Sequence, residues 1–446
     1  MKLVFQPHEK PSFGANIVFA IQQLLAIMAA TLVVPLIVGN GMSPAAALFG
    51  AGIGTFVYLL FTKFRSPVFL GSSFAFLGSM ATAFAGAASV ALGYVGIILG
   101  AIFAGLVYVV IAIVVKFAGV NWINKLMPPV VIGPTVAIIG LSLAGNAIGD
   151  LQKAPAGGHT LIAVLCGLVT LFVTIIASTF GKKMAKMIPF IIGILAGYAV
   201  GSIFTVIGNV AGIDALKVID YSALTGLVAN GVNVGTFLTL PDFTFVTAFG
   251  AIGEINASYV ATIAVAYVPV AFVVFAEHIA DHKNISSIIE KDLLADPGLH
   301  RTLLGDGVGS MAGAFFGGCP NTTYGESVAC VAISRNASVF TIATTSVLAI
   351  LISFLAPFVA FVNTIPSCVM GGVCVALYGF IAVSGLKMVQ KVDLEQNKNL
   401  FVVSTILICG IGGLTLTFGQ VTLTSIACAL ILGILVNVVL GKKADE

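Results

Sequence analysis

Long apolar runs, separated by short polar links, dominate this chain from residue 14 onward. A helix needs about 20 apolar residues to cross the hydrocarbon of a bilayer. Runs near that length are predicted at 14–38, 44–62, 67–87, 90–115, 128–148, 160–180, 188–209, 258–280, 301–318, 322–336, 338–361, 365–386, 400–417 and 421–441. The pattern predicts an all-α polytopic membrane protein with 14 transmembrane segments.

Two of these segments do not read as simple helices. The segment 67–87 starts with the polar run Gly71-Ser72-Ser73, and the segment 322–336 is short and contains Glu326. Polar backbone is tolerated at membrane depth only where it is buried in protein or lines a cavity. Both segments are therefore expected to be interrupted.

The composition supports the membrane assignment. Only 8% of the residues are charged, whereas soluble domains carry about 25%, so a water-soluble protein is excluded. The 50 glycines allow close helix approach. The first apolar run, near Phe13, lacks a short signal-peptide core followed by a cleavage site, and we interpret it as a retained span.

The distribution of basic residues predicts the orientation, because cytoplasmic loops collect Lys and Arg. With 14 crossings and the N-terminus inside, only Lys153 and Lys217 fall outside. The segments predicted to be cytoplasmic carry Lys2, Lys10, Lys63, Arg65, Lys116, Lys125, Lys182, Lys183, Lys186, Lys283, Lys291, Arg301, Arg335, Lys387, Lys391, Lys398, Lys442 and Lys443. Both termini are therefore predicted to be cytoplasmic.

The two halves of the chain resemble each other. The run from Leu48 to Thr55 reads like the run from Leu303 to Ser310, and each precedes a proline-containing link and one of the two interrupted segments. An odd number of crossings separates the copies, so the second half is inverted. Inverted repeats with interrupted helices are typical of secondary transporters, whose substrate sits near the midplane. The free N–H groups at facing half-helix ends favour a substrate with amide-like C=O and N–H edges.

Acidic residues inside the hydrocarbon are candidates for function, because their burial is costly. Glu277 ends an apolar run and Glu326 lies in an interrupted segment; each is interpreted as a substrate ligand or proton carrier rather than a structural helix–helix contact. Burial disfavours the charged form of a carboxyl, so such a group can load and release a proton. Asp281 lies one turn after Glu277 and is either functional or a solvated helix end. Asp306 is interpreted as a helix-start residue.

Other polar and aromatic residues leave alternatives open. Glu277-His278 and Asp281-His282 have the spacing of metal ligands, but we interpret them as polar residues where a helix leaves the bilayer, and no metal or cofactor is expected. Gln22 and Gln23 either join helices or line a cavity. The aromatic residues that flank the interrupted segments, and that could stack on a flat ring, are Phe74, Phe76 and Tyr324. The seven cysteines are expected to be small buried apolar residues.

Enzyme signatures are not found in the sequence. It contains no HExxH, GxSxG or GxxxxGK[ST] motif. We therefore expect neither an enzyme nor an ATP-driven pump, and an ion gradient is the expected driving force.

Several of these motifs together resemble the nucleobase/ascorbate transporter family, and within it the uracil-transporting bacterial branch. The resemblance lies in Ala276-Glu277-His278, the run from Lys291 to Arg301, the run from Pro320 to Glu326, and Gly71-Ser72-Ser73-Phe74-Ala75-Phe76. It covers essentially the whole chain. It implies a multi-pass protein of the cytoplasmic membrane that imports a nucleobase, most simply uracil, with a proton.

The resemblance also implies an architecture. A core domain would comprise residues 1–127 (spans 1–4) and 246–361 (spans 8–11), and a gate domain residues 128–245 (spans 5–7) and 362–446 (spans 12–14). Short strands would break spans 3 and 10. The core would move like an elevator against a gate that forms a homodimer in the lipid bilayer, and no nucleic-acid partner is implied.

The same resemblance assigns the site. Glu277 and Glu326 would hydrogen-bond the edge of the base, and the backbone of Phe74 and Gly325 would contact its carbonyls. The implied substrate-binding set is Glu277, Glu326, Phe74, Gly325, Tyr324 and Ser73, and the proton-coupling residues are Glu277 and Asp281.

The chain departs from the family pattern at three places. The uracil-transporting branch has a histidine where Asp281 stands. The acid is typical of the purine-transporting branch, although Ala280 replaces the glycine of that branch. The usual Gln-His of span 1 reads Gln22-Gln23, and Glu326 is followed by an atypical Ser327. Xanthine or another purine is therefore the alternative substrate. An anion transporter of the same fold is a further alternative, which the two glutamates disfavour.

Overall fold

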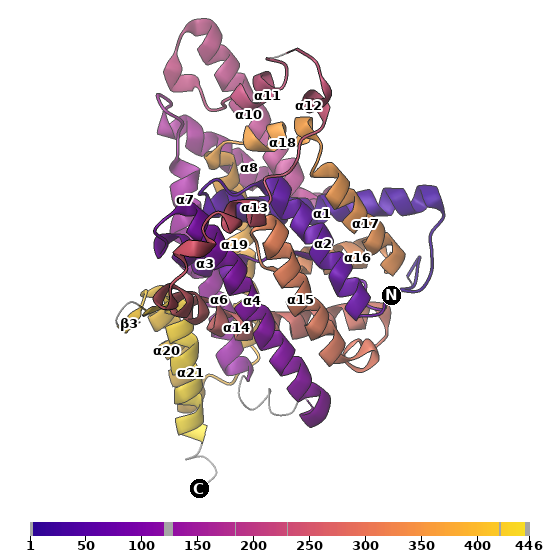
Figure 1. Cartoon of the computed structure of the whole chain (residues 1–446), viewed down its shortest axis with the longest axis vertical. Coiled ribbons are helices and arrows are strands. Elements are labelled where there is room, and N and C mark those ends of the chain that lie inside the picture. The colour runs from indigo at the N-terminus through magenta and orange to yellow at the C-terminus, as the bar shows by residue number, and fades with distance from the viewer. Residues whose placement is uncertain (1–2, 120–127, 183, 230, 419–420, 442–446) are drawn as a thin grey trace.

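The computed structural model describes residues 3–119, 128–182, 184–229, 231–418 and 421–441 and is predominantly helical (Figure 1). Among these residues, 8 helical segments are long and apolar enough to cross a bilayer. They are α1 (Phe13–Val38), α2 (Pro44–Phe61), α4 (Val90–Ala118), α6 with α7 (Pro129–Ser142 and Ala144–Gln152), α8 (Thr160–Phe180), α10 (Pro189–Ala211), α14 (Ala257–Ile289) and α19 (Ser367–Val389). The predicted helical membrane protein is confirmed, whereas the count of 14 crossings stays a prediction.

The remaining predicted spans are shorter, less apolar or interrupted helices. They are α3 (Leu77–Ala85), α15 (Leu299–Gly317), α16 (Gly325–Ser334), α17 (Val339–Ile352), α18 (Ala356–Asn363), α20 (Asn397–Ile411) and α21 (Ser425–Gly441). The links carry short turns: η1 (Phe74–Phe76), α9 (Met184–Met187), η2 (Asp214–Leu216), α11 (Ser222–Gly226), α12 (Val234–Phe237), α13 (Thr244–Phe249), η3 (Ile252–Glu254) and η4 (Leu294–Gly298).

The structure differs from the predicted spans at three places. Helix α14 continues to Ile289, nine residues beyond the apolar run, because buried contacts hold its last turns. The predicted span 128–148 becomes two helices, which meet at Leu143. The predicted spans 400–417 and 421–441 are joined by an antiparallel hairpin of β3 (Leu416–Phe418) and β4 (Val421–Leu423), where the sequence alternates apolar and threonine residues. Of the residues used for orientation, Lys2, Lys125, Lys183, Lys442 and Lys443 lie outside the described residues.

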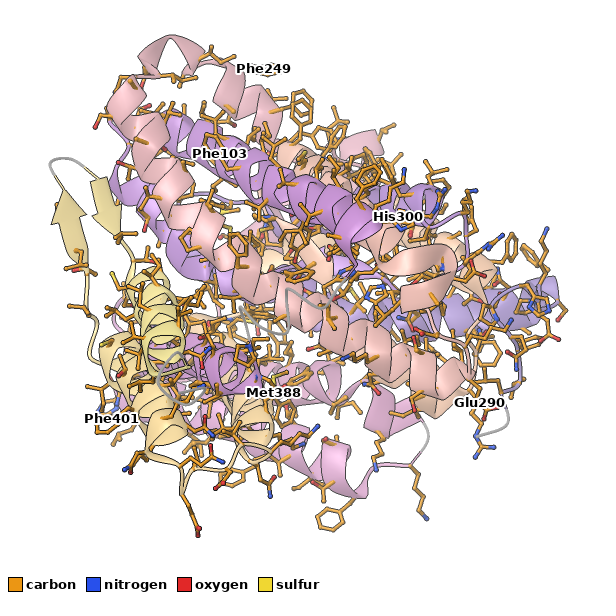
Figure 2. All side chains as sticks on the ribbon, turned by 90° about the horizontal axis from the view of Figure 1, so that it is seen from below. Phe103, Phe249, Glu290, His300, Met388 and Phe401 are labelled. Atoms are coloured by element: carbon orange, nitrogen blue, oxygen red, sulfur yellow. The ribbon has the colours of Figure 1, made fainter. Side chains whose placement is uncertain are left out.

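Large apolar side chains cover much of the outer surface. Phe249 and Phe401, labelled at the periphery in Figure 2, are 57% and 59% exposed, and Phe117 is 80% exposed. So many exposed large apolar side chains are foreign to a soluble monomer. It is the surface expected of a multi-pass membrane protein, and the polar residues of interest lie inside.

Two short strands meet in the interior. β1 (Leu70–Ser72) precedes η1 and α3, β2 (Asn321–Thr323) precedes α16, and the strands pair antiparallel with Gly71 opposite Thr322. Helix α2 anchors both of them. The Thr55 hydroxyl donates to Leu70 O (3.1 Å) and accepts from Leu70 N (2.9 Å), and Asn321 Nδ2 donates to Gly50 O (3.0 Å).

The two copies of the repeated glycine motif pack against each other. A β-carbon on Gly54 would lie 2.6 Å from Gly309 O, and one on Gly309 would lie 2.7 Å from Gly54 O. Gly50 faces Gly313 and Gly317 in the same way. The residue numbers run in opposite directions along α2 and α15, so the helices cross antiparallel. Their backbones come this close because glycine carries no side chain.

The helices pack in two groups. In the first, α2 packs against α15 and α17, α4 against α14 and α15, and α1 against α16 and α17. In the second, α19 packs against α6, α7 and α8, α10 against α8, and α20 against α6 and α21. Figure 1 shows α20 and α21 together at one end of the molecule. The main cavity lies where elements of both groups face each other.

Candidate functional site

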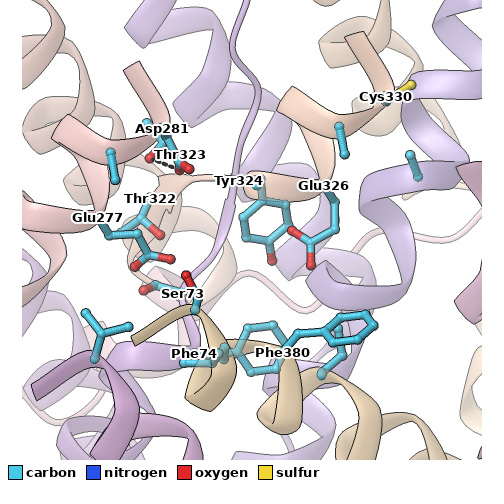
Figure 3. A pocket seen from close by; sticks show the side chains of 18 of the residues that line it. Ser73, Phe74, Glu277, Asp281, Thr322, Thr323, Tyr324, Glu326, Cys330 and Phe380 are labelled. Atoms are coloured by element: carbon cyan, nitrogen blue, oxygen red, sulfur yellow. Dashed lines mark hydrogen bonds between the residues drawn. The ribbon is translucent and has the colours of Figure 1, made fainter. Parts of the chain in front are cut away.

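The cavity has a volume of about 460 Å³ and contains every residue predicted to bind substrate or couple protons. Ser73 and Phe74 follow β1, Tyr324, Gly325 and Glu326 follow β2, and Glu277 and Asp281 lie on α14. Figure 3 shows the labelled side chains converging from these elements. The opposite wall comes from α6, α10 and α19, with Val136, Phe190 and Phe380 among its residues.

The three acids occupy different positions on this wall. Glu277 and Asp281 are one helical turn apart, so both point to the cavity from one face of α14. Thr323 Oγ1 donates a hydrogen bond of 2.7 Å to Asp281 Oδ2 (Figure 3). Glu277 has no hydrogen-bond partner within the described parts of the chain. Asp281 is therefore tied to β2 and is no solvated helix end, while the Glu277 carboxyl stays available for a ligand.

Backbone donors face the cavity from α16. Glu326 lies in the first turn of α16, which Tyr324 precedes in an extended conformation. The first N–H groups of a helix have no partner inside it, so those of this turn can donate to a ligand. Gly325, the first residue of α16, is exposed to the cavity and has no heavy atom within 4 Å of the position of a β-carbon. The backbone can thus be approached closely here.

Aromatic rings shape the rest of the wall. The Tyr324 hydroxyl donates to Ser72 O at 2.6 Å, so its ring is fixed between β1 and β2. Phe74 lies edge-on to Tyr378, with ring centroids 6.0 Å apart. Phe76 is not at the cavity, contrary to its suggested stacking role, because it is buried and stacks on Tyr267 instead.

Behind the acids lies a buried polar network that the sequence alone did not reveal. His278 contacts Asp306 (Nδ1 to Oδ2, 2.6 Å) and Thr302 (Nε2 to Oγ1, 3.0 Å). His282 contacts the Tyr58 hydroxyl through Nε2 at 2.7 Å. All five side chains are fully buried. The network joins α14 to α2 and α15, so it fixes the rotation of the helix whose other face carries Glu277 and Asp281.

Two interpretations of these residues need correction. Asp306 is not a helix-start residue, because it lies in the interior of α15, seven residues after Leu299. The histidines are not polar residues at a membrane exit, because helix packing removes them completely from solvent. The sequence signal for this network was an acid followed by a histidine, repeated four residues later. This spacing places the two acids on one face of the helix and the two histidines on the adjacent face.

Gln23 joins helices. Its Nε2 donates to Ser327 Oγ at 2.6 Å, and the same hydroxyl accepts from Phe69 N at 3.1 Å. Gln23 therefore connects α1 to α16 and to the segment before β1. Gln22 is half-buried and does not line the cavity.

The cavity is acidic, and its described lining offers no cluster of metal-binding side chains. Within the described ranges, no group of three His, Cys, Asp or Glu residues could hold a metal ion. Three carboxyl groups line the cavity, and Lys186 is the one basic residue among the described lining residues. An uncharged ligand with N–H donors suits this wall better than an anion, because a carboxylate accepts hydrogen bonds but repels negative charge.

Comparison with known proteins places this arrangement in a family. The profile of a family described as Permease family matches residues 14–419. The uracil permease of Bacillus caldolyticus is 38% identical over 99% of this chain and 96% of its own length. Those of Bacillus subtilis and Escherichia coli K12 are 37% and 34% identical, each over 96% of this chain and over 93% and 91% of their own lengths.

Solved structures share the fold at low sequence identity. The transmembrane domain of the cyanobacterial bicarbonate transporter BicA superposes with a TM-score of 0.63 at 14% identity, covering 96% of this chain and 98% of its own. The murine anion transporter Slc26a9 gives a TM-score of 0.62 at 9% identity, covering 98% of this chain and 70% of its own. These similarities concern the fold alone.

Proposed function

The chain belongs to this permease family, and from that premise we propose that it is a symporter that carries uracil together with a proton across the cytoplasmic membrane. It is a nucleobase permease and not an enzyme. The choice of substrate rests on one observation. The free N–H groups at the start of α16 and the unpaired carboxyl of Glu277 line the same cavity. A pyrimidine offers carbonyl acceptors and N–H donors on its edges, which match these two kinds of group.

The lining residues support the following binding mode. Glu277 and Glu326 accept hydrogen bonds from the N–H groups of the base, and the backbone N–H groups near Phe74 and Gly325 donate to its carbonyls. Tyr324 and Ser73 complete the wall around the ring. The cavity of about 460 Å³ lies within the range of small-molecule sites.

We propose Glu277 as the proton carrier. Its carboxyl lacks a fixed partner, whereas Asp281 accepts from Thr323. A carboxyl without a fixed donor takes up a proton more readily than one that a hydroxyl stabilises in its charged form. Asp281 then acts as a second group that senses the protonation of Glu277 across one turn of α14.

The two packing groups support a movement of one domain against the other. A core domain (1–127 and 246–361) carries β1, β2 and the acids, and a gate domain (128–245 and 362–446) supplies α6, α10 and α19. The core slides along a dimeric gate like an elevator, which exposes the cavity to one side of the membrane and then the other. Both termini lie in the cytoplasm in this arrangement.

A purine such as xanthine is the second candidate, and the acid at Asp281 favours it. The decisive experiment is a thermal-shift screen of the purified protein against uracil, thymine, xanthine, guanine, adenine, ascorbate and sulfate, followed by uptake of the radiolabelled hit into proteoliposomes with an imposed proton gradient. Uracil should raise the melting temperature most and should accumulate. Stabilisation by xanthine alone would show that the substrate is a purine, and stabilisation by sulfate alone would show that it is an anion.

A further inference from the structure

A second cavity, of about 340 Å³, adjoins the first. Its lining includes Ser79 and Thr82 of α3, Ser142 and Asn146 at the α6–α7 junction, and Thr424 beside the β3–β4 hairpin. None of the described residues that line it is charged. It is a polar but uncharged compartment, unlike the acidic cavity beside it.

The second cavity continues the first along three separate elements. On α14, Glu277 lines the first cavity and Val270 lines the second. At 1.5 Å per residue, these two positions are about 10 Å apart along the helix. On α6 the order is Val136 and then Ser142. In the interrupted segment, Ser73 faces the first cavity and Thr82 the second. The two cavities therefore lie in line, one after the other, between the same elements.

A thin wall divides them. Phe74, Ala75 and Ile139 are the residues that line both cavities. Ile139 is 3% exposed, and the Phe74 ring is held edge-on against Tyr378. Phe74 and Ala75 come from the interrupted segment and Ile139 from α6, so the wall closes across the boundary between the two packing groups.

Asn146 is the group in the second cavity that is suited to recognition. Three hydroxyls of its lining donate locally: Ser79 Oγ to Ala266 O, Thr82 Oγ1 to Gly78 O, and Ser142 Oγ to Ile139 O. Asn146 is exposed and forms no hydrogen bond among the described residues. Its carboxamide offers one acceptor and two donors, which can pair with the C=O and N–H edge of a lactam ring without any charge.

We propose that the second cavity is a second binding site for the uncharged heterocycle, with Asn146 as its ligand, and that Phe74 and Ile139 close the passage between the two sites. The proposal rests on the proposed function, because the class of substrate is taken from it. The base binds to Asn146 on one side of the wall and contacts the acidic residues on the other side.

Paired Ser-to-Cys variants test the geometry. Ser142→Cys places a thiol in the second cavity, Ser178→Cys places one in the first, and Gly149→Cys places one on α7 outside both. Each is treated with a membrane-impermeant thiol reagent in right-side-out and inside-out vesicles, with wild type as the background for the native cysteines. The Ser142→Cys and Ser178→Cys thiols should react from opposite faces of the membrane.

Uracil should protect both cavities and leave the control unaffected. At ten times its dissociation constant, uracil should slow modification of Ser142→Cys and of Ser178→Cys about tenfold, and that of Gly149→Cys not at all. Protection of Ser178→Cys alone would overturn the second site and leave the proposed function intact. Protection of neither would remove uracil as the substrate.

Two further substitutions test the named residues. Asn146→Ala should raise the KM for entry from the side of the second cavity about three- to tenfold, the value of one hydrogen bond, and leave the KM from the other side unchanged. Ile139→Ala should thin the wall and let uracil leak down its gradient, whereas Ile138→Ala, an equally buried neighbour that lines neither cavity, should not. An unchanged KM for Asn146→Ala, or equal leak in both isoleucine variants, would refute the assignment.

Discussion

Replacing Gly71 by alanine tests whether the pairing of the two interrupted segments builds the binding site. A β-carbon at this position would lie 2.9 Å from Cδ2 of Tyr324 and closer still to two other atoms of that ring. Real β-carbons essentially never approach a neighbour below 3.0 Å, so one of the two residues must move. Tyr324 is 4% exposed, and its hydroxyl is tied to Ser72 O at 2.6 Å. The ring therefore has no free direction inside the core and can shift only toward the cavity.

The expected magnitude follows from this geometry. Inserting a methyl group into a well-packed site costs about 1–3 kcal/mol. If the strands stay paired, the strain appears as lost stability. If Tyr324 moves into the cavity, the strain is relieved at the expense of binding, and 1–3 kcal/mol corresponds to an affinity for uracil that is about 5- to 150-fold weaker. The loss of folding stability and the loss of uracil-binding free energy should therefore add up to about 1–3 kcal/mol.

The assay measures both quantities on the same preparation. Melting temperature and the dissociation constant for uracil are determined for wild type, Gly71→Ala and Gly78→Ala. Gly78 is the matched control for the first cavity, because it lies in α3 of the same segment, lines only the second cavity, and has no heavy atom within 4 Å of its β-carbon position. Gly78→Ala should be neutral or slightly stabilising, since alanine is the better helix former by about 0.5–1 kcal/mol.

A double variant isolates the contact. Removing the ring in Gly71→Ala/Tyr324→Val should make the alanine harmless, so that the double variant resembles Tyr324→Val alone. The reasoning would be refuted if Gly71→Ala matched wild type in both stability and affinity, or if its defect persisted unchanged without the Tyr324 ring.

Three further predictions concern the acids and the interior. Glu277→Gln should abolish accumulation of uracil, while exchange of labelled for unlabelled uracil across the membrane continues. In wild type, one proton driven by 100 mV can concentrate uracil about fiftyfold. A variant that still concentrates uracil would exclude Glu277 as the proton carrier. Gln23→Leu removes the α1–α16 hydrogen bond to the buried Ser327 hydroxyl, which keeps its bond from Phe69 N. It should therefore lower the free energy of unfolding by about 0.5–1.5 kcal/mol in a denaturant titration, whereas Gln22→Leu should have little effect. Asp306→Leu leaves a buried ring nitrogen of His278 without its partner and should lower the free energy of unfolding by about 1–3 kcal/mol in the same titration. Asp306→Asn keeps a hydrogen-bond acceptor and should lower it less. Equal losses of stability in the two variants would show that side-chain volume rather than hydrogen bonding matters.

Much of the architecture is legible in the sequence, because the bilayer imposes a simple rule. A run of about 20 apolar residues has few alternatives to a membrane helix, and α1, α8 and α10 lie within about two residues of their predicted limits. The Leu48–Thr55 and Leu303–Ser310 similarity likewise reflects a local need, since close backbone crossing requires glycine. The acids Glu277 and Glu326 stood out because charge is so rare in the spans.

What only the tertiary structure decided is which residues face each other across long sequence separations. Neither the partner of Asp306 nor the burial of the histidines follows from local pattern, because both depend on the rotation of α14 against α2 and α15. The same holds for Phe76, which points to Tyr267 rather than to the cavity where Phe74 lies. Hydropathy reports how deep a segment sits in the membrane but not which way each side chain turns. The direction of each side chain, and with it the shape of both cavities, is set by packing between segments that the chain brings together only when it folds.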